Sequence, residues 1–296
     1  MAHLFDLGRE SPHFDRLKNI RRLAPERSGH ASEEHVRHQL YIARDRQTRT
    51  DVLIKTTTRP GTIYQQNLLN EIASLTTINQ ALPDSWYFPF VHAHGRLRDG
   101  NVYLIMTLFD EPPLATSIPA ERVSGRLVGS LLTAIEVFRA LAELHRIPIF
   151  HVDLNPMNVL HRIERQRHII RIVDFESSYE AARHSAGEAY NPSTTPGYSA
   201  PEVSRRQWPD PGPPPDARAD VYSLGAVLYT MLAGFDWTWD SDAATAVERD
   251  QDLDPDLAGI LRRAVAADRE ARYGSVQELQ DAVGGYLERI WPGRKW

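Results

Sequence analysis

The first third of the chain alternates apolar and polar positions with the two-residue period of β-strands. Turn residues, among them Arg98-Asp-Gly100, separate the strand-like stretches in pairs, so the pattern predicts two antiparallel hairpins. Between the hairpins, residues 62–79 space their apolar side chains near the helical period and predict one helix. The predicted strands are residues 39–43, 51–55, 91–97 and 101–109.

Helical patterns dominate the remainder of the chain. Residues 127–145 carry one apolar face and predict an amphipathic helix, whereas residues 219–233 are apolar on nearly every side, as a buried central helix would be. Residues 208–216 hold five prolines and one glycine, which is typical of a rigid surface loop. The basic residues between 162 and 171 are expected on a turn that faces water. A β-rich first third and an α-rich remainder favour an α+β fold of two lobes with a cleft between them.

Composition narrows the class of protein. The chain has 296 residues, of which 42% are apolar and 25% charged, enough for a substantial core in a globular protein. A net charge of −5 argues against nucleic acid as the main partner. The absence of cysteine excludes disulfides and thiolate metal sites and suits a reducing compartment. No apolar stretch is long enough for a membrane span and the start carries no signal pattern, so we expect a cytoplasmic protein.

Two short runs concentrate carboxylates and amides at a spacing that suits phosphoryl transfer. The run His151-Val-Asp-Leu-Asn-Pro-Met-Asn158 places Asp153 and Asn158 five positions apart. In the run Ile172-Val-Asp-Phe-Glu176, Asp174 follows a β-branched strand. Carboxylates and an amide on neighbouring turns can orient a hydroxyl and hold Mg²⁺ against a nucleotide. The two runs therefore indicate a phosphotransferase or a protein derived from one.

A lysine and a glutamate upstream fit the same chemistry. Lys55 ends a predicted strand, and Glu71 lies on the predicted helix that follows. A buried lysine needs a carboxylate partner, and such a pair could bind the phosphates of a nucleotide. Taken alone the two residues indicate little, because most lysines and glutamates lie on the surface. Their position ahead of the two runs makes the assignment specific.

Three later segments complete an ordered set of motifs: Thr195-Pro-Gly-Tyr-Ser-Ala-Pro-Glu202, Asp220-Val-Tyr-Ser-Leu-Gly225 and Asp268-Arg-Glu-Ala-Arg272. With all parts in this order, the chain resembles bacterial relatives of the eukaryotic-type Ser/Thr protein kinases from about residue 21 to residue 287. The resemblance implies a bilobal protein-kinase-like fold with a small β-rich N-lobe and a larger α-helical C-lobe. The expected boundaries are a leader at 1–20, the N-lobe at 21–110, the C-lobe at 111–290 and a tail at 291–296.

The resemblance also implies ATP and Mg²⁺ as cofactors and a protein substrate or regulatory partner. Asp153 would accept the proton of the substrate hydroxyl. Asn158 and Asp174 would hold Mg²⁺, with Glu176 as a further candidate ligand. Lys55 would contact the α and β phosphates of ATP, positioned by Glu71.

Further positions would shape the adenine pocket and the activation segment. Leu40, Leu53 and the gatekeeper Met106 would line the pocket, and the backbone of Thr107 and Phe109 would meet adenine. Glu202 would pair with Arg272 to anchor the activation segment. Asp220 would hold the catalytic-loop backbone from the central helix, and Thr195 would contact Asp153 beside the substrate. The spine that joins the lobes would be a stack of His151, Phe175 and Leu75.

Several positions depart from the kinase pattern. The three glycines of the phosphate-binding loop would fall on Glu33, His35 and His38, so the loop would lack the close backbone approach that glycine allows. Four further substitutions are Leu53 for the alanine that packs on adenine, Asn155 for the catalytic-loop lysine, Glu176 for the glycine after Asp-Phe, and Val152 for the arginine that binds a phosphorylated activation loop.

The departures leave three functions open. The first is ATP- and Mg²⁺-dependent phosphoryl transfer to a Ser/Thr hydroxyl of a protein, favoured because Lys55, Glu71, Asp153, Asn158 and Asp174 are all present. The second is a pseudokinase that acts as a binding or scaffolding module. The third is a small-molecule kinase of the same fold, since the two runs also resemble aminoglycoside and choline phosphotransferases, although those proteins lack the segment that ends at Glu202.

Overall fold

The structure is a computed structural model that describes residues 12–23, 38–204, 212–239 and 241–293. Contacts between residues divide the chain into two compact units: unit 1 covers residues 1–110 and unit 2 covers residues 111–296. None of the helices within the described ranges combines the length and the apolar character that crossing a membrane requires.

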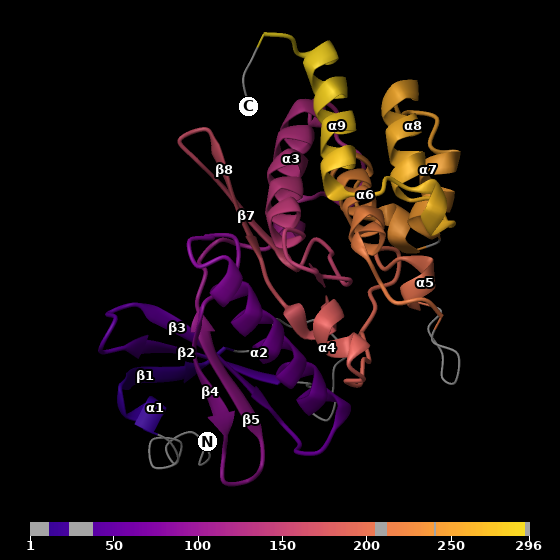
Figure 1. The fold of residues 1–296 in the computed structure, drawn as a ribbon. Coiled ribbons are helices and arrows are strands. Elements are labelled where there is room, and N and C mark those ends of the chain that lie inside the picture. Colours follow the sequence, from indigo (N-terminus) through magenta and orange to yellow (C-terminus); the bar gives the residue numbers. More distant parts are fainter. Residues whose placement is uncertain (1–11, 24–37, 205–211, 240, 294–296) are drawn as a thin grey trace. The chain divides into compact units, whose positions relative to one another are not determined.

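Unit 1 is built on an antiparallel sheet of five strands in the order β1-β2-β3-β5-β4 (Figure 1). Both hairpins and the helix predicted from the sequence are present, with bounds within a few residues of those expected. The strands are β1 Leu17–Arg22, β2 His38–Asp45, β3 Asp51–Thr57, β4 Val91–Arg96 and β5 Val102–Thr107, and the helices are α1 Pro12–Asp15 and α2 Ile63–Ala81.

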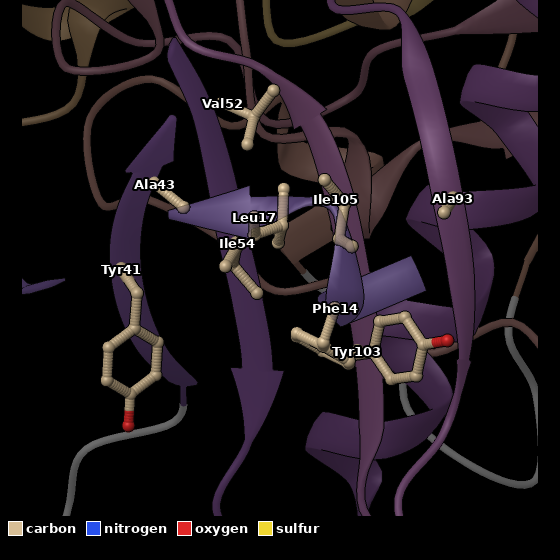
Figure 2. Packing of buried hydrophobic residues seen from close by; sticks show 9 residues of the cluster. All are labelled: Phe14, Leu17, Tyr41, Ala43, Val52, Ile54, Ala93, Tyr103 and Ile105. Carbon is tan, nitrogen blue, oxygen red and sulfur yellow. The ribbon is translucent and has the colours of Figure 1, made fainter. Parts of the chain in front are cut away.

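The two faces of this sheet carry different side chains, because successive residues of a strand point to opposite sides. The register places Leu40 opposite Lys55 and Leu53 opposite Met106, so these four side chains share one face, because opposed residues point to the same side. The other face is apolar. Its core cluster consists of Phe14, Leu17, Tyr41, Ala43, Val52, Ile54, Ala93, Tyr103 and Ile105 (Figure 2).

The expected leader at residues 1–20 is wrong for its second half. Residues 12–22 form α1 and the edge strand β1, and Phe14 and Leu17 are buried in the core cluster, where the ring of Phe14 lies 4.9 Å from that of Tyr103. The sequence pattern did not reveal this strand, because β1 lies at the edge of the sheet and only Leu17 among its residues is fully buried. A bulge between Lys18 and Arg21 further disturbs the alternation.

Unit 2 is mainly helical (Figure 1). The predicted helices over 127–145 and 219–233 are α3 and α6, which pack against each other and against α9. The helices are α3 Leu127–Leu144, α4 Ala181–Ser185, α5 Pro201–Ser204, α6 Ala217–Ala233, α7 Ala243–Arg249, α8 Pro255–Ala264 and α9 Val276–Ile290, with short 3-10 turns η3 Leu114–Ser117, η4 Phe175–Ser177, η5 Asp236–Trp239 and η6 Arg269–Ala271. The strands are β6 Ile149–Phe150, β7 Val159–Glu164, β8 Arg167–Ile172 and β9 Tyr179–Glu180.

Helix α6 is the buried centre of unit 2, as its apolar pattern predicts. Every residue from Ala219 to Leu232 is buried. Gly225 is required by the close approach of the end of α8, because a Cβ atom at this position would lie 2.8 Å from side-chain atoms of both Ala264 and Val265. The α6 helix therefore supplies a rigid base on which the preceding loops can be fixed.

The basic stretch expected on a turn instead forms the two-stranded β7–β8 hairpin, whose register runs from Val159 opposite Ile172 to Glu164 opposite Arg167. Only Arg165 and Gln166 occupy the turn, both with positive φ. Alternation explains the error: Ile170 and Ile172 are buried on one side of β8, while Arg171 between them points to the other side and pairs with Glu111 at 3.3 Å. The loop expected over 208–216 begins outside the described residues.

Candidate active site

Lys55 and Glu71 form a buried ion pair in unit 1. Strand β3 carries Lys55 on the sheet face that faces α2, and the lysine Nζ lies 2.8 Å from Oε2 of Glu71, which is completely buried. A carboxylate in such surroundings needs a cation beside it, since the cost of burying an unpaired charge is several kcal/mol. The predicted contact is present, and it fixes the lysine ammonium at one point on the sheet.

The same sheet face and the end of β5 gather the residues expected around adenine. Leu40 and Leu53 are half-buried, and Met106 is buried opposite Leu53. The backbone N–H of Thr107 donates to Phe90 O at 2.9 Å. Phe109 follows two residues later and is half-buried.

Leu23 pairs with Leu40, a contact that the sequence pattern did not reveal. Its N–H donates to the carbonyl of Leu40 at 2.9 Å, which extends the β1–β2 pairing by one step. Residues 24–37, which separate Leu23 from β2 in the sequence, lie outside the described ranges. Glu33 and His35, two of the three expected glycine positions, lie outside the described residues, and His38 begins β2.

In unit 2, residues 151–158 form the expected catalytic loop, and a residue of helix α6 anchors its backbone. The fully buried Asp220 accepts hydrogen bonds from the backbone N–H of His151 at 2.8 Å and of Val152 at 2.7 Å. His145, at the end of α3, also bonds to Asp220, with its Nε2 2.7 Å from Oδ2. Burial raises the pKa of the Asp220 carboxyl, but the hydrogen bond and charge of His145, the nearby His151 and the hydrogen bond from Val152 outweigh it and lower the pKa below its ordinary value. His145 is a contact that the sequence reasoning did not foresee.

Asp153 follows directly in this loop and is anchored through one carboxylate oxygen. The hydroxyl of Thr195 donates to Asp153 Oδ1 at 2.7 Å, which is the predicted contact, and that of Ser199 approaches the same atom at 3.3 Å. Among the described residues, none donates a hydrogen bond to Asp153 Oδ2. The carboxylate is thus fixed on one side and open on the other.

The surroundings of Asp153 make it a stronger base than an exposed aspartate. Burial raises the pKa of its carboxyl to about 6, and the neighbouring carboxylate of Asp174 adds to the rise. The hydrogen bond from Thr195 and the nearby His151 act in the opposite direction. A carboxylate with a pKa near 6 is mostly ionised at neutral pH and still accepts a proton readily.

The expected metal ligands present oxygen atoms. Asn158 uses its Nδ2 to donate to the carbonyl of Asp153 at 2.9 Å, which leaves Oδ1 as the acceptor atom of its amide. Asp174 has a φ of +67°, and a carboxylate oxygen of Glu176, two residues on, lies within 4.8 Å of one from Asp174. Carboxylate and amide oxygens are the ligands that Mg²⁺ takes in proteins, so the donor set fits this cation.

The activation segment, residues 174–202, is fixed at its end by an ion pair. The guanidinium of Arg272 donates two hydrogen bonds of 2.8 Å to the carboxylate of Glu202, as predicted. Its remaining donors reach the carbonyls of Ala266, Arg218 and Ala267. Because Arg272 is buried and every donor nitrogen has an acceptor, this pair is a rigid anchor rather than a surface contact.

The middle of the activation segment is held by its own side chains. The ring of His184 lies 4.8 Å from those of both Tyr179 and Tyr190, in a stacked and a tilted arrangement. Ser177 and Ser193 interlock, since Ser193 N–H donates to Ser177 Oγ at 2.9 Å and that hydroxyl donates back to Ser193 O. We call these five residues the aromatic clasp.

The sequence of residues 38–283 matches the family profile described as Protein kinase domain. The chain belongs to this family. The fold agrees: a double mutant of the kinase domain of PknI from Mycobacterium tuberculosis superposes with a TM-score of 0.60 at 22% identity, covering 92% of this chain and 96% of that one. The expected bilobal kinase fold is therefore confirmed.

Curated relatives are themselves protein kinases. The DNA damage-responsive serine/threonine-protein kinase RqkA of Deinococcus radiodurans is 32% identical over 245 residues, which cover 71% of this chain and 35% of that protein. Human ribosomal protein S6 kinase alpha-2 is 37% identical over 140 residues, 46% of this chain and 18% of the relative. The chain thus spans about a fifth to a third of the length of these relatives.

Proposed function

We propose that the protein transfers the γ-phosphoryl group of ATP to a Ser/Thr hydroxyl of a protein substrate, with Mg²⁺ as the metal. The observation that carries the proposal is the Asp153 carboxylate, fixed through Oδ1 by Thr195 and open at Oδ2, in a loop that also presents Asn158. Membership of the protein kinase family supports it. The small-molecule alternative has no comparable support.

The residues divide the reaction between them. Asp153 orients the substrate hydroxyl and takes its proton as the oxygen forms a bond to the γ-phosphorus and the bond to the β–γ bridging oxygen breaks, which releases ADP. Lys55, held by Glu71, binds the α and β phosphates. Asn158 and Asp174 hold Mg²⁺, which supplies charge neutralisation when it is bound.

Leu23, Leu40, Leu53 and Met106 enclose the adenine ring, and the backbone of Thr107 and Phe109 forms its hydrogen bonds. Leu53 in place of a small residue narrows this space. Glu176 is a third ligand or a partner that orients one, because one of its carboxylate oxygens lies within 4.8 Å of an oxygen of Asp174.

The proposal is tested by thermal shift and by transfer of label. Mg·ATP should stabilise the protein by RT ln(1 + [L]/Kd), whereas ATP without Mg²⁺ should give a much smaller shift, since the sequence between residues 23 and 38 has a single glycine, Gly29, and no glycine-rich motif. Radiolabelled γ-phosphate should enter dephosphorylated casein or the protein itself, and Asp153→Asn should stop this incorporation while the Mg·ATP shift persists.

A pseudokinase role is the second candidate, and Asn155, which lacks the positive charge of the usual lysine, is the observation that favours it. It predicts a Mg·ATP shift, or none, without incorporation of label in the wild type. Incorporation that Asp153→Asn abolishes would rule it out. The cytoplasmic location stays a prediction that cell fractionation can check.

A further inference from the structure

Asn155 is a fully engaged part of the catalytic loop. This side chain is 6% exposed, and both of its polar atoms have partners. Its Nδ2 donates to Thr195 Oγ1 at 3.1 Å and to the carbonyl of Asp153 at 3.2 Å, and its Oδ1 accepts from the N–H of Met157 at 2.9 Å. A residue retained only by drift would not be expected to satisfy its whole amide in a buried position.

The direction of these hydrogen bonds is fixed by chemistry. The N–H of Met157 can only donate, so the atom of Asn155 that faces it is the oxygen and the atom that faces Thr195 is the nitrogen. The hydroxyl of Thr195 therefore accepts from Asn155, and its single proton is left to point to Asp153 Oδ1, 2.7 Å away. The result is a relay from Asn155 through Thr195 to Asp153.

The relay decides which carboxylate oxygen of Asp153 meets the substrate. Oδ1 receives the hydrogen bond from Thr195 and a longer one from Ser199, whose own hydroxyl oxygen accepts from the N–H of Thr195 at 2.8 Å. Oδ2 is left for the substrate hydroxyl. A carboxylate that could rotate would spend part of its time with neither oxygen aligned, and alignment of reacting groups is a major part of what such an enzyme supplies.

We propose that Asn155 is the positioning residue of the catalytic loop, holding Asp153 in its productive orientation through Thr195. The inference rests on the proposed function. It also gives a different meaning to the replacement of lysine: the amide keeps the hydrogen-bond donor and gives up the charge. Alignment of Asp153 is preserved, and neutralisation of the transferred phosphoryl group falls to the metal.

A simpler role for Asn155 would be to shape the turn. Its Oδ1 closes a local turn with the N–H of Met157, which asparagine often does in loops. The two roles differ in which substitutions they tolerate. Asn155→Lys keeps a donor for Thr195 but loses the acceptor for Met157, so it should preserve the relay and weaken the turn.

The experiment measures kcat and KM for ATP with radiolabelled Mg·ATP and dephosphorylated casein. Asn155→Ala should lower kcat by about 10- to 100-fold with KM for ATP within about twofold of the wild type. Asn155→Lys should recover kcat to within about threefold of the wild type. Asn191→Ala, an exposed asparagine of the activation segment, is the matched control and should leave both constants unchanged.

A double-mutant cycle tests the relay itself. Thr195→Val should lower kcat about as much as Asn155→Ala, and the double variant should be no slower than either single one, because one broken step already frees Asp153. Thr195→Ser keeps the hydroxyl and should retain most of the activity. Melting temperatures of all variants show whether each one folds, and Thr195→Val with Thr195→Ser carries the test if Asn155→Ala does not.

Three results would overturn the inference. They are a kcat of Asn155→Ala within twofold of the wild type, effects of the two single variants that multiply in the double variant, and an Asn155→Lys variant as slow as Asn155→Ala. If the wild type incorporates no label although it binds Mg·ATP, the proposed function itself fails and this inference with it. The two failures are therefore distinguishable.

Discussion

The carboxylate of Asp220 holds the backbone of Val152 in a conformation that valine rarely adopts. The N–H of Val152 donates to Asp220 Oδ1 at 2.7 Å, and the φ of Val152 is +70°. A β-branched residue in the left-handed region costs on the order of 1–3 kcal/mol, which the surrounding structure must offset. Asp220 thus stabilises a strained turn one residue before Asp153.

Asp220→Asn should destabilise unit 2 and disturb the catalytic loop. The asparagine has one acceptor oxygen in place of two, so one of the backbone N–H groups of His151 and Val152 would face an NH₂ group. We expect a loss of about 2–4 kcal/mol and a melting temperature lower by several degrees. Thermal unfolding measures the loss, and Asp236→Asn, an exposed aspartate of unit 2, serves as the control. An unchanged melting temperature would show that the turn does not depend on Asp220.

The local part of the site could be predicted from the sequence. Asp153, Asn158 and Asp174 stand in short runs, so their spacing alone indicates one loop and one strand end. The contact between Thr195 and Asp153 joins residues 42 positions apart. Such a contact depends on tertiary packing, and only the resemblance to protein kinases made it predictable.

Other parts could not be predicted for physical reasons. Strand β1 has one fully buried side chain and a bulge, so its alternation is too weak to stand out. Leu23 was missed with it, because its role follows from pairing with Leu40. The substitution at Asn155 was visible, but its meaning lies in the hydrogen bonds to Thr195 and Met157, which a sequence does not display.

Removal of the Lys55 ammonium should abolish transfer. Lys55→Met leaves the buried carboxylate of Glu71 without this partner at 2.8 Å, so we expect phosphoryl transfer to fall by more than about 100-fold and stability to fall by about 3 kcal/mol. Glu71→Gln should lower activity less, because the lysine itself remains. Incorporation of label and the Mg·ATP thermal shift measure these effects, with Lys18→Met on the exposed side of β1 as control. Full activity in Lys55→Met would remove Lys55 from the site.

The metal assignment predicts different results for two neighbouring carboxylates. Asp174→Asn should reduce transfer by about 1000-fold or more while the melting temperature changes little, because it removes a ligand of Mg²⁺. Glu176→Gln should raise the Mg²⁺ concentration needed for half-maximal activity several-fold. The measurement is a Mg²⁺ titration of activity, and Glu121→Gln, an exposed glutamate of unit 2, is the control.

Glu176→Gly restores the glycine that usually follows Asp-Phe in protein kinases. The activity of this variant shows whether Glu176 supports the metal or impairs the site. If Glu176 supports the metal, this variant should be slower than the wild type and need more Mg²⁺. Activity that rises clearly in Glu176→Gly would contradict the metal role and show that the glutamate impairs the site.

Phosphorylation of the activation segment should not be the step that switches the protein on. Val152 occupies the place of the arginine that binds a phosphorylated loop, and it cannot bind phosphate. The aromatic clasp and the pair of Glu202 with Arg272 order the segment without a modification. Phosphatase treatment, and a double variant with Ser193→Ala and Thr194→Ala, should therefore leave transfer within about twofold of the untreated wild type.

A variant of the aromatic clasp tests whether side-chain packing orders the activation segment. His184→Ala removes the ring between Tyr179 and Tyr190 and should lower activity and increase proteolysis within residues 174–202. Thr195 stays intact in all of these variants because it contacts Asp153. If dephosphorylation silences transfer while Mg·ATP binding persists, phosphorylation of this segment is the switch despite Val152.

A stacked histidine pair on the β7–β8 hairpin should make stability depend on pH. The rings of His161 and His168 are 5.3 Å apart, and Thr133 on α3 contacts Nδ1 of His168 at 3.0 Å. Burial, and then the neighbouring His168, lower the pKa of His161 to about 4, and burial also lowers that of His168. Below its ordinary pKa of about 6.5 the unfolded chain binds protons that the folded pair does not, so stability falls as the pH drops from 7 toward 4.

The size of this effect follows from the shift at His161. Between pH 7 and pH 5 the pair should contribute a loss of about 1 to 2 kcal/mol, after allowance for the exposed part of the rings. His161→Phe keeps an aromatic ring but does not titrate, so the fall in melting temperature between these pH values should shrink by a few degrees. His94→Phe, at an exposed position of β4 in unit 1, controls for the loss of one histidine and should retain the full fall. A His161→Phe protein whose melting temperature falls as steeply as that of the wild type would show that acid acts elsewhere in the chain.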